Sequence, residues 1–241
     1  MSICKLCKKD RPLRNSHVIP AFVARWLRKT SATGNLRSSR QPNQLVQDTR
    51  KLPMLCHECE QRFGAWEAKF ARCIFLPRHA GTSAAGNYGP WLRLFLASIA
   101  WRVATVQIAN HTQVGSNYNN AAQSLEHWRR FLLDETTNFE EYTIHLLFLN
   151  ATTLTSESLP KYYNHFLLRT TGYRLIVQPR VLAVLVKLPG MVVWLPILPR
   201  KPRGWVVART TARDWRIERW LQLLRWLAKV ARNRMVDRRP R

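Results

Sequence analysis

Cys4-Lys5-Leu6-Cys7 and Cys56-His57-Glu58-Cys59 are the two stretches that decide the fold of the first third of this chain. Each contains two cysteines separated by two residues, which is the spacing with which many proteins chelate zinc. Reducing conditions inside a cell keep thiols free, so metal binding explains these pairs better than disulfides do. The sequence therefore predicts one structural zinc ion, Zn2+, held by four thiolates, those of Cys4, Cys7, Cys56 and Cys59.

Two residues near these pairs, His57 and Cys73, are not expected to bind the zinc ion. His57 lies between two of the zinc ligands, but four thiolates already complete a tetrahedron, so we interpret it as an exposed polar residue. Cys73, the fifth cysteine, falls on the apolar side of a helix expected over residues 58–75 and is interpreted as a core thiol. The interval between the pairs, residues 8–55, is longer than a simple zinc ribbon requires, so we expect further structure inside it.

A histidine in a short apolar run lies inside this interval, in Asn15-Ser16-His17-Val18-Ile19-Pro20. This run and the later Leu55-Cys56-His57-Glu58-Cys59-Glu60 resemble the zinc-containing HNH (His-Me finger, ββα-metal) endonucleases. In that family a Cys-x-x-Cys knuckle precedes a strand that reads Asp/Glu-His-Ile/Val-x-Pro, and a second Cys-x-x-Cys opens the helix after the hairpin. The two stretches are also similar to a group of bacterial HNH-like proteins. The resemblance covers residues 1–80, a third of the chain.

The resemblance implies a catalytic role for His17 as the general base that activates water, while a divalent cation, Mg2+ or Mn2+, stabilises the developing charge. The family places a metal-binding Asp beside this histidine, where this chain has Ser16, and a His or Asn after the second pair, where it has Glu60. A carboxylate is a suitable ligand for a hard cation, so Glu60 and Asp48, from the expected second strand, are the candidate cation ligands. Asn43 is the candidate for the family's central Asn, which orients the histidine.

A non-catalytic interpretation stays open beside this one. The zinc module would then be a treble-clef-like scaffold that only binds nucleic acid or regulates another protein, and His17 would tie the knuckle to the backbone. Ser16, which replaces the expected Asp, motivates this alternative. Glu67, two helical turns after Glu60, is interpreted as a surface charge that pairs with Lys or Arg.

The charge of the chain indicates a polyanionic partner. The 241 residues carry a net charge of +25, and the sequence pI is about 11.2. Residues 1–80 contribute +11, residues 81–197 contribute +3 and residues 198–241 contribute +11, so two basic ends flank a nearly neutral centre. This distribution is typical of a nucleic-acid binder, and the resemblance to nucleases favours DNA. A short helix is expected after Pro20, and one side of it carries Arg25, Arg28 and Lys29. These side chains either contact phosphates or form an ordinary solvent-exposed face; the sequence leaves both interpretations open.

The sequence predicts an α+β protein. The resemblance implies an N-terminal Cys4 zinc ββα-metal (HNH-like) module, and hydropathy patterns predict a mixed domain of helices and antiparallel strands followed by a long amphipathic C-terminal helix. The expected domains are residues 1–80, 81–199 and 200–241, with a Gly- and Pro-rich linker over residues 76–90. The expected later elements are helices over 91–108, 120–133 and 214–235, and strands over 142–149, 162–169, 173–178, 181–188 and 191–198. A basic tail closes the chain.

Two stretches of the sequence bear on membrane association. The most apolar stretch, residues 181–198, contains Lys187 and a Pro189-Gly190 turn, so we expect two buried strands there and no transmembrane span. The helix expected over 214–235 is rich in Trp and Arg. We expect its apolar side to pack on the protein and its basic side to contact phosphates, in preference to a role at a membrane surface. The first twenty residues lack a secretory signal, which predicts a cytoplasmic protein. The sequence leaves the oligomeric state open.

Overall fold

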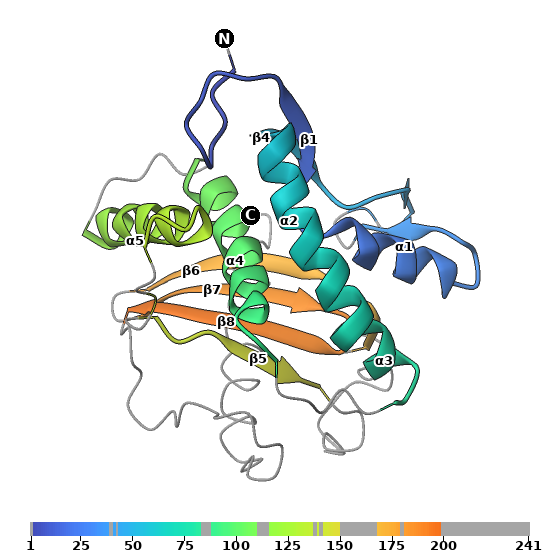
Figure 1. Cartoon of the computed structure of the whole chain (residues 1–241). Coiled ribbons are helices and arrows are strands. Elements are labelled where there is room, and N and C mark those ends of the chain that lie inside the picture. The colour runs from blue at the N-terminus through green and yellow to red at the C-terminus, as the bar shows by residue number, and fades with distance from the viewer. Residues whose placement is uncertain are drawn as a thin grey trace, which may run out of the picture.

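The structure, a computed structural model, describes residues 2–38, 41, 43–82, 88–109, 116–136, 139, 142–149, 168–178 and 181–198. The elements of the first part are β1 (Leu13–His17), α1 (Ala21–Lys29), β2 (Leu36–Arg37), β3 (Leu45–Val46), β4 (Lys51–Cys56), α2 (His57–Phe70), the π-helix η1 (Ala71–Phe75) and α3 (Leu76–His79). The second part contains α4 (Trp91–Ala109), α5 (Ser116–Leu132), β5 (His145–Phe148), β6 (Gly172–Gln178), β7 (Val181–Leu188) and β8 (Met191–Leu198). Helices and antiparallel sheets together make this an α+β protein (Figure 1).

The N-terminal part is a turn, a hairpin and a helix. Strands β1 and β4 pair antiparallel, with His17 opposite Lys51, and α2 begins directly where β4 ends. Between the two strands the chain inserts α1 and the short β2–β3 pair. The expected helix after Pro20 is therefore confirmed, and its apolar side is buried through Val23, Ala24 and Leu27.

The helix that follows the second cysteine pair changes its winding near its end. We expected one helix over residues 58–75, and the structure divides this stretch into α2 and the π-helical turn η1. Phe63, Phe70 and Ile74 are buried along it, as their helical spacing predicts. Part of the expected linker is helical as well, because α3 continues from η1 as far as His79.

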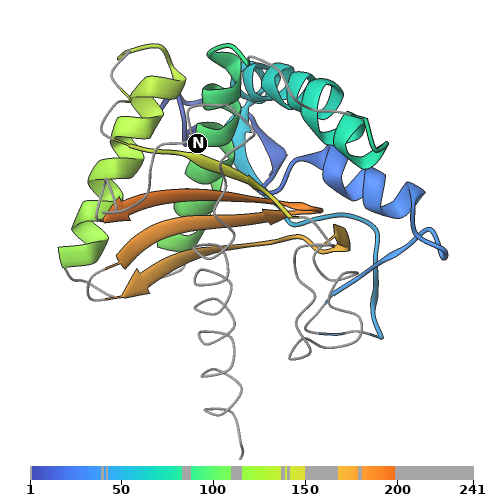
Figure 2. The same ribbon diagram turned by 90° about the horizontal axis from the view of Figure 1, so that it is seen from below.

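A four-stranded antiparallel sheet, in the order β5-β8-β7-β6, forms the second layer (Figure 2). The apolar stretch 181–198 is a β-hairpin with a turn at Pro189 and Gly190, so the interpretation as two buried strands is confirmed. Gly190 has a φ of 63°, a conformation that costs a glycine little. The expected strand over 162–169 falls largely outside the described residues, and so do the C-terminal helix over 214–235 and the tail.

Helix α4 lies against one face of this sheet and contacts β6, β7 and β8 (Figure 1). It is apolar on most sides, and its middle, from Phe95 to Ala104, is fully covered. Alternate residues of β7 divide between the two faces: Leu182, Val184, Val186 and Leu188 share the core with α4, whereas Ala183 belongs to a separate apolar cluster on the opposite face. Both faces of the sheet are thus apolar, which explains why the strands show little alternation in sequence.

One hydrophobic core crosses residue 80, where the sequence suggested a domain boundary. Phe70 of α2 stacks on Phe95 of α4 with ring centroids 4.1 Å apart, and Phe63 meets Trp101 edge to face at 6.0 Å. Phe22 of α1 lies 6.4 Å from Phe95. The N-terminal ββα part therefore packs directly on the helical layer that covers the sheet.

Among the described residues, α4 is the one helix long and apolar enough to cross a bilayer by length and composition. Of its most apolar 18-residue window, 61% is buried inside the fold. Core helices of water-soluble proteins share this property, so the composition of α4 carries little weight for a membrane span.

Candidate functional site

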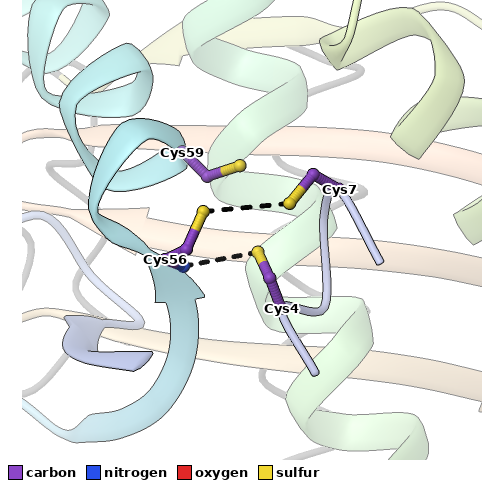
Figure 3. A group of neighbouring side chains, drawn as sticks. All are labelled: Cys4, Cys7, Cys56 and Cys59. Atoms are coloured by element: carbon purple, nitrogen blue, oxygen red, sulfur yellow. Dashed lines mark hydrogen bonds between the residues drawn. The ribbon is translucent and has the colours of Figure 1, made fainter. Parts of the chain in front are cut away.

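The four cysteines of the two Cys-x-x-Cys pairs come together at the end of the β1–β4 hairpin (Figure 3). Their Sγ atoms all lie within 4.8 Å of one another, and those of Cys7 and Cys56 are 3.8 Å apart. Cys4, Cys56 and Cys59 are buried, and Cys7 is half-buried. A tetrahedral zinc ion with Zn–S bonds of about 2.3 Å separates its sulfurs by about 3.8 Å, so this cluster is compatible with zinc.

Local backbone geometry brings these thiols together. Cys4 and Cys7 lie in a tight turn that is closed by a hydrogen bond from the Lys8 N–H to the Cys4 carbonyl, and Lys8 has a φ of 60°. Cys56 ends β4 and precedes the first residue of α2, so Cys59 follows in the first helical turn. The Lys5 N–H donates to the Met54 carbonyl at 2.9 Å, which docks the turn onto β4.

The thiols differ in acidity. Burial alone would raise the pKa of Cys4, but hydrogen bonds from backbone N–H groups, first that of Cys56, lower it to about 7. Burial raises the pKa of Cys59, and its neighbour Cys56 raises it further. Four thiols this close favour a state in which a cation compensates their negative charge, because unscreened thiolates repel one another.

His57 and Cys73 do not belong to this cluster, in agreement with their predicted roles. His57 is exposed at the start of α2, where its Nδ1 lies 3.5 Å from an Arg14 nitrogen. Cys73 is half-buried in η1 and packs against the hydrophobic core.

A second polar group surrounds His17, the last residue of β1. Its Nε2 lies 2.9 Å from Asp48 Oδ2, and the Lys51 ammonium lies 2.6 Å from the same oxygen. The side chain of His17 is 17% exposed, so solvent and ligands reach it while the strand supports it. The structure thus brings together two residues, His17 and Asp48, that are 31 positions apart in the chain.

The Asp48 carboxylate sets the tautomer of the imidazole. Burial would raise the pKa of Asp48, but hydrogen bonds from Lys51 and then His17 outweigh it and hold the pKa below its ordinary value. An ionised Asp48 accepts a hydrogen bond, so the Nε2 of His17 carries the proton and Nδ1 is the basic nitrogen. Within the described residues, Nδ1 makes no hydrogen bond, so it is available to a ligand.

Ser16 and Glu60 form a separate pair. The Ser16 hydroxyl donates to Glu60 Oε2 at 2.5 Å and accepts the Leu55 N–H at 3.3 Å. Ser16 is fully buried, whereas the adjacent His17 is not, as expected for consecutive strand residues that face opposite ways. Ser16 and Glu60, which the motif resemblance aligns with metal-ligand positions, are therefore neighbours in this fold, where they supply a hydroxyl and a carboxylate.

Asp48 and Glu60 do not share a site with other ligands. Of the residues that the structure describes, the four cysteines form the one group of three or more His, Cys, Asp or Glu ligand atoms this close together. Asp48 is engaged by His17 and Lys51, and Glu60 by Ser16. Asn43 is exposed between β2 and β3, and no described contact joins it to His17.

Sequence reasoning missed Arg102 of α4. Its Nη1 donates to the carbonyl oxygen of His17 at 2.9 Å, and its Nη2 lies 2.7 Å from Glu67 Oε1. Glu67 was expected to pair with a basic residue at the surface; the pairing is found, but Arg102 is only 1% exposed. The available signal was a single arginine in the middle of an apolar helix, since a buried guanidinium requires partners.

Comparison of the chain with protein-family models, with curated protein sequences and with solved structures returned no match. The functional interpretation therefore depends on the geometry of the site and on the resemblance of its motifs.

Proposed function

We propose that this protein is an HNH-type endonuclease that hydrolyses phosphodiester bonds in DNA, with His17 as the general base and a zinc ion in the four-cysteine cluster as a structural scaffold. The observation that carries the proposal is the His17–Asp48 pair at the end of a strand that is joined to the four-cysteine turn and helix. The motif resemblance supports the same assignment, and the net charge of +25 suits a polyanionic substrate.

In this proposal the imidazole takes the proton of the attacking water through Nδ1. Asp48 keeps Nε2 protonated, holds the ring in place and stabilises the imidazolium that forms. This division of roles resembles that of other His–carboxylate pairs, in which the carboxylate does not itself accept the proton. Lys51, whose side chain is 43% exposed, places a cation beside the pair, where it can contact a phosphate oxygen.

A divalent cation, Mg2+ or Mn2+, is proposed at Glu60. Mg2+ commonly binds one or two carboxylates together with waters and phosphate oxygens, and the half-buried Glu60 carboxylate is a ligand of that type. The Ser16 hydroxyl is fully buried and already bonded to Glu60 and to the Leu55 N–H, so it is not counted among the ligands. Bound there, the cation would supply Lewis-acid stabilisation of the leaving oxygen. Asp48 is paired with His17 and Lys51, and Glu60 with Ser16, so a cation would have to compete with these contacts; the cation stays a prediction of the motif resemblance.

The second candidate function is a nucleic-acid-binding or regulatory module without hydrolytic activity. The observation in its favour is that each carboxylate of the site already has a partner within the chain: Lys51 and His17 for Asp48, and Ser16 for Glu60. A site whose charges are compensated internally does not require a cation for stability.

Hydrolysis assays separate the two candidates. The purified chain is incubated with supercoiled plasmid, linear duplex, single-stranded DNA and RNA, in Mg2+, in Mn2+ and in EDTA. For the nuclease, His17→Ala lowers the rate by about 10²–10⁴-fold, the usual contribution of a general base. Asp48→Asn lowers it less, because the base remains but its orientation and tautomer are no longer enforced.

His57→Asn is the matched control, since His57 is exposed and lies outside both the four-cysteine cluster and the His17 pair. Zinc content and circular dichroism are measured for every variant, which separates loss of chemistry from loss of fold. The nuclease proposal would be refuted if wild type and His17→Ala showed the same negligible hydrolysis in all metals. If the chain also bound DNA with an affinity that falls as salt rises, the result would favour the binding module.

A further inference from the structure

Arg102 is a buried cation in the middle of the most apolar helix of the protein. Its residue is 1% exposed, and its neighbours in α4, Trp101 and Val103, are 1% and 0% exposed. Transferring a guanidinium from water to such a position is costly, and an aliphatic side chain of similar volume is often as stable or more stable there. Packing alone therefore does not explain why this position holds an arginine.

The guanidinium joins three elements. Nη1 donates to the backbone carbonyl oxygen of His17 in β1 at 2.9 Å, and Nη2 forms the 2.7 Å ion pair with Glu67 in α2. The guanidinium carbon also lies over the Phe63 ring of α2, 5.4 Å from its centroid. Glu67 compensates the charge by proximity, since neither Nη2 nor Nε has a hydrogen bond of good geometry among the described residues. The directed hydrogen bond of the guanidinium is the one from Nη1 to the His17 carbonyl oxygen.

The backbone directly after this carbonyl is also restrained. The Val18 N–H donates to the Arg50 carbonyl at 3.0 Å, and the Thr49 hydroxyl donates to the Ile19 carbonyl at 3.1 Å. These two bonds tie the segment after His17 to Thr49 and Arg50, the two residues between Asp48 and Lys51. Arg102 supplies the complementary restraint from the helical layer, and it acts on the peptide unit of His17 itself.

We propose that Arg102 is a positioning residue for His17, a proposal that rests on the function proposed above. By holding the His17 carbonyl, Arg102 fixes the orientation of the peptide from which the imidazole projects, and hence the position of Nδ1 relative to the substrate. Glu67 acts behind it by compensating the charge of the guanidinium. The site is then completed by the helical layer, since the proposed base lies in the ββα part and its support comes from α4.

The decisive variant is the double substitution Arg102→Met with Glu67→Met. It removes the donor to His17 and leaves no unpaired buried charge, so it avoids the destabilisation expected when one partner of a buried pair is deleted. The expected result is a fall in kcat of roughly 10²-fold, the usual cost of a displacement of about 1 Å in a catalytic group. The Kd for an uncleaved duplex in EDTA is expected to stay within twofold, because Arg102 does not touch the solvent-exposed surface.

Arg102→Lys is the conservative variant. Lysine keeps one charged donor but loses the planar fork, so it should recover part of the kcat that the double variant loses and leave Kd unchanged. Arg62→Met is the matched control. Arg62 also links two helices by bonding a carbonyl, Leu132 O, and an acid, Asp134, each at 3.0 Å, but it does not contact His17. Its kcat should equal that of wild type.

Amide hydrogen exchange provides a readout that does not depend on hydrolysis. In the double variant the Val18 amide should exchange at least tenfold faster, while amides in the β7–β8 hairpin keep their rates. A structural role alone would accelerate exchange in both regions together. A folded double variant with wild-type kcat and wild-type exchange at Val18 would overturn the proposal. Absence of hydrolysis by the wild-type chain would refute the nuclease instead, and exchange at Val18 would still decide whether Arg102 restrains this segment.

Discussion

Removal of zinc is the perturbation with the largest expected effect on this protein. The four Sγ atoms lie within 4.8 Å of one another, whereas a zinc tetrahedron with bonds of about 2.3 Å requires sulfur separations of about 3.8 Å. Binding therefore requires the sulfurs to move by at most about 1 Å, a change that side-chain rotation supplies. We expect one zinc per chain, bound without rearrangement of β1, β4 or α2.

The expected loss of stability on zinc removal follows from the two chain segments that the cluster connects. The ligands join residues 4–7 to residues 56–59, and structural zinc sites in small peptides bind with apparent free energies of about 10–16 kcal/mol. That range equals or exceeds the free energy of unfolding of a typical domain, about 5–15 kcal/mol. A strong chelator should therefore unfold the N-terminal turn and loosen the hairpin. The β7–β8 hairpin shares one hydrophobic core with this region, so its unfolding temperature should fall as well.

Metal analysis and thiol titration check this expectation. The native chain should contain one equivalent of zinc and show one readily titrated thiol, that of half-buried Cys73, whereas chelation with denaturant should expose all five. Protons compete with zinc for thiolates, so the zinc should also be released as the pH falls. A native chain without zinc that shows four or five reactive thiols, and whose thermal unfolding does not respond to a chelator, would refute the reasoning.

Three further predictions concern the core, a buried cation and the nucleic-acid contact. Phe95→Ala should destabilise the protein by about 3–5 kcal/mol and lower one common unfolding transition, because Phe95 stacks on Phe70 across residue 80; two separate thermal transitions would contradict this. Burial lowers the pKa of Lys187 from 10.5 to about 7, so its cost to stability is full below pH 7 and disappears above pH 10.5. Lys187→Met should therefore raise the free energy of unfolding in urea more at pH 7 than at pH 10, by at most about 4–5 kcal/mol, and an equal gain at both pH values would disprove it. Lys51→Gln should reduce the slope of log K against log salt for duplex DNA by about 1, and an unchanged slope would remove Lys51 from the phosphate contacts.

The elements that local patterns specify were predictable. Helical spacing of apolar residues located α1 and α4, and the Pro189-Gly190 turn between two apolar runs located the β7–β8 hairpin. The four-cysteine cluster was also predictable, because two residues between cysteines leave few alternatives to a shared metal. The division of the last part of α2 into a π-helical turn had no sequence signal that we could identify.

The candidate site was predictable only as a set of residue types. Motif resemblance selected His17, and it named Asp48 and Glu60 as two ligands of one cation. The structure pairs Asp48 with His17 instead and pairs Glu60 with Ser16, because consecutive residues of β1 point to opposite sides. The alternation of side chains is a property of any strand. Which acidic residue lies beside Ser16 and which beside His17, however, depends on the path of the chain between α1 and β4.

By itself, the sequence determined the local elements, the cysteine cluster and the concentration of positive charge at both ends of the chain. Each of these depends on spacing over a few residues or on composition. Only the tertiary structure decided that Arg102 reaches the carbonyl of His17, 85 positions away, and that one core joins the ββα part to the helix on the sheet. Such contacts depend on which apolar faces pack together. That choice comes from the burial of the whole chain rather than from any single segment.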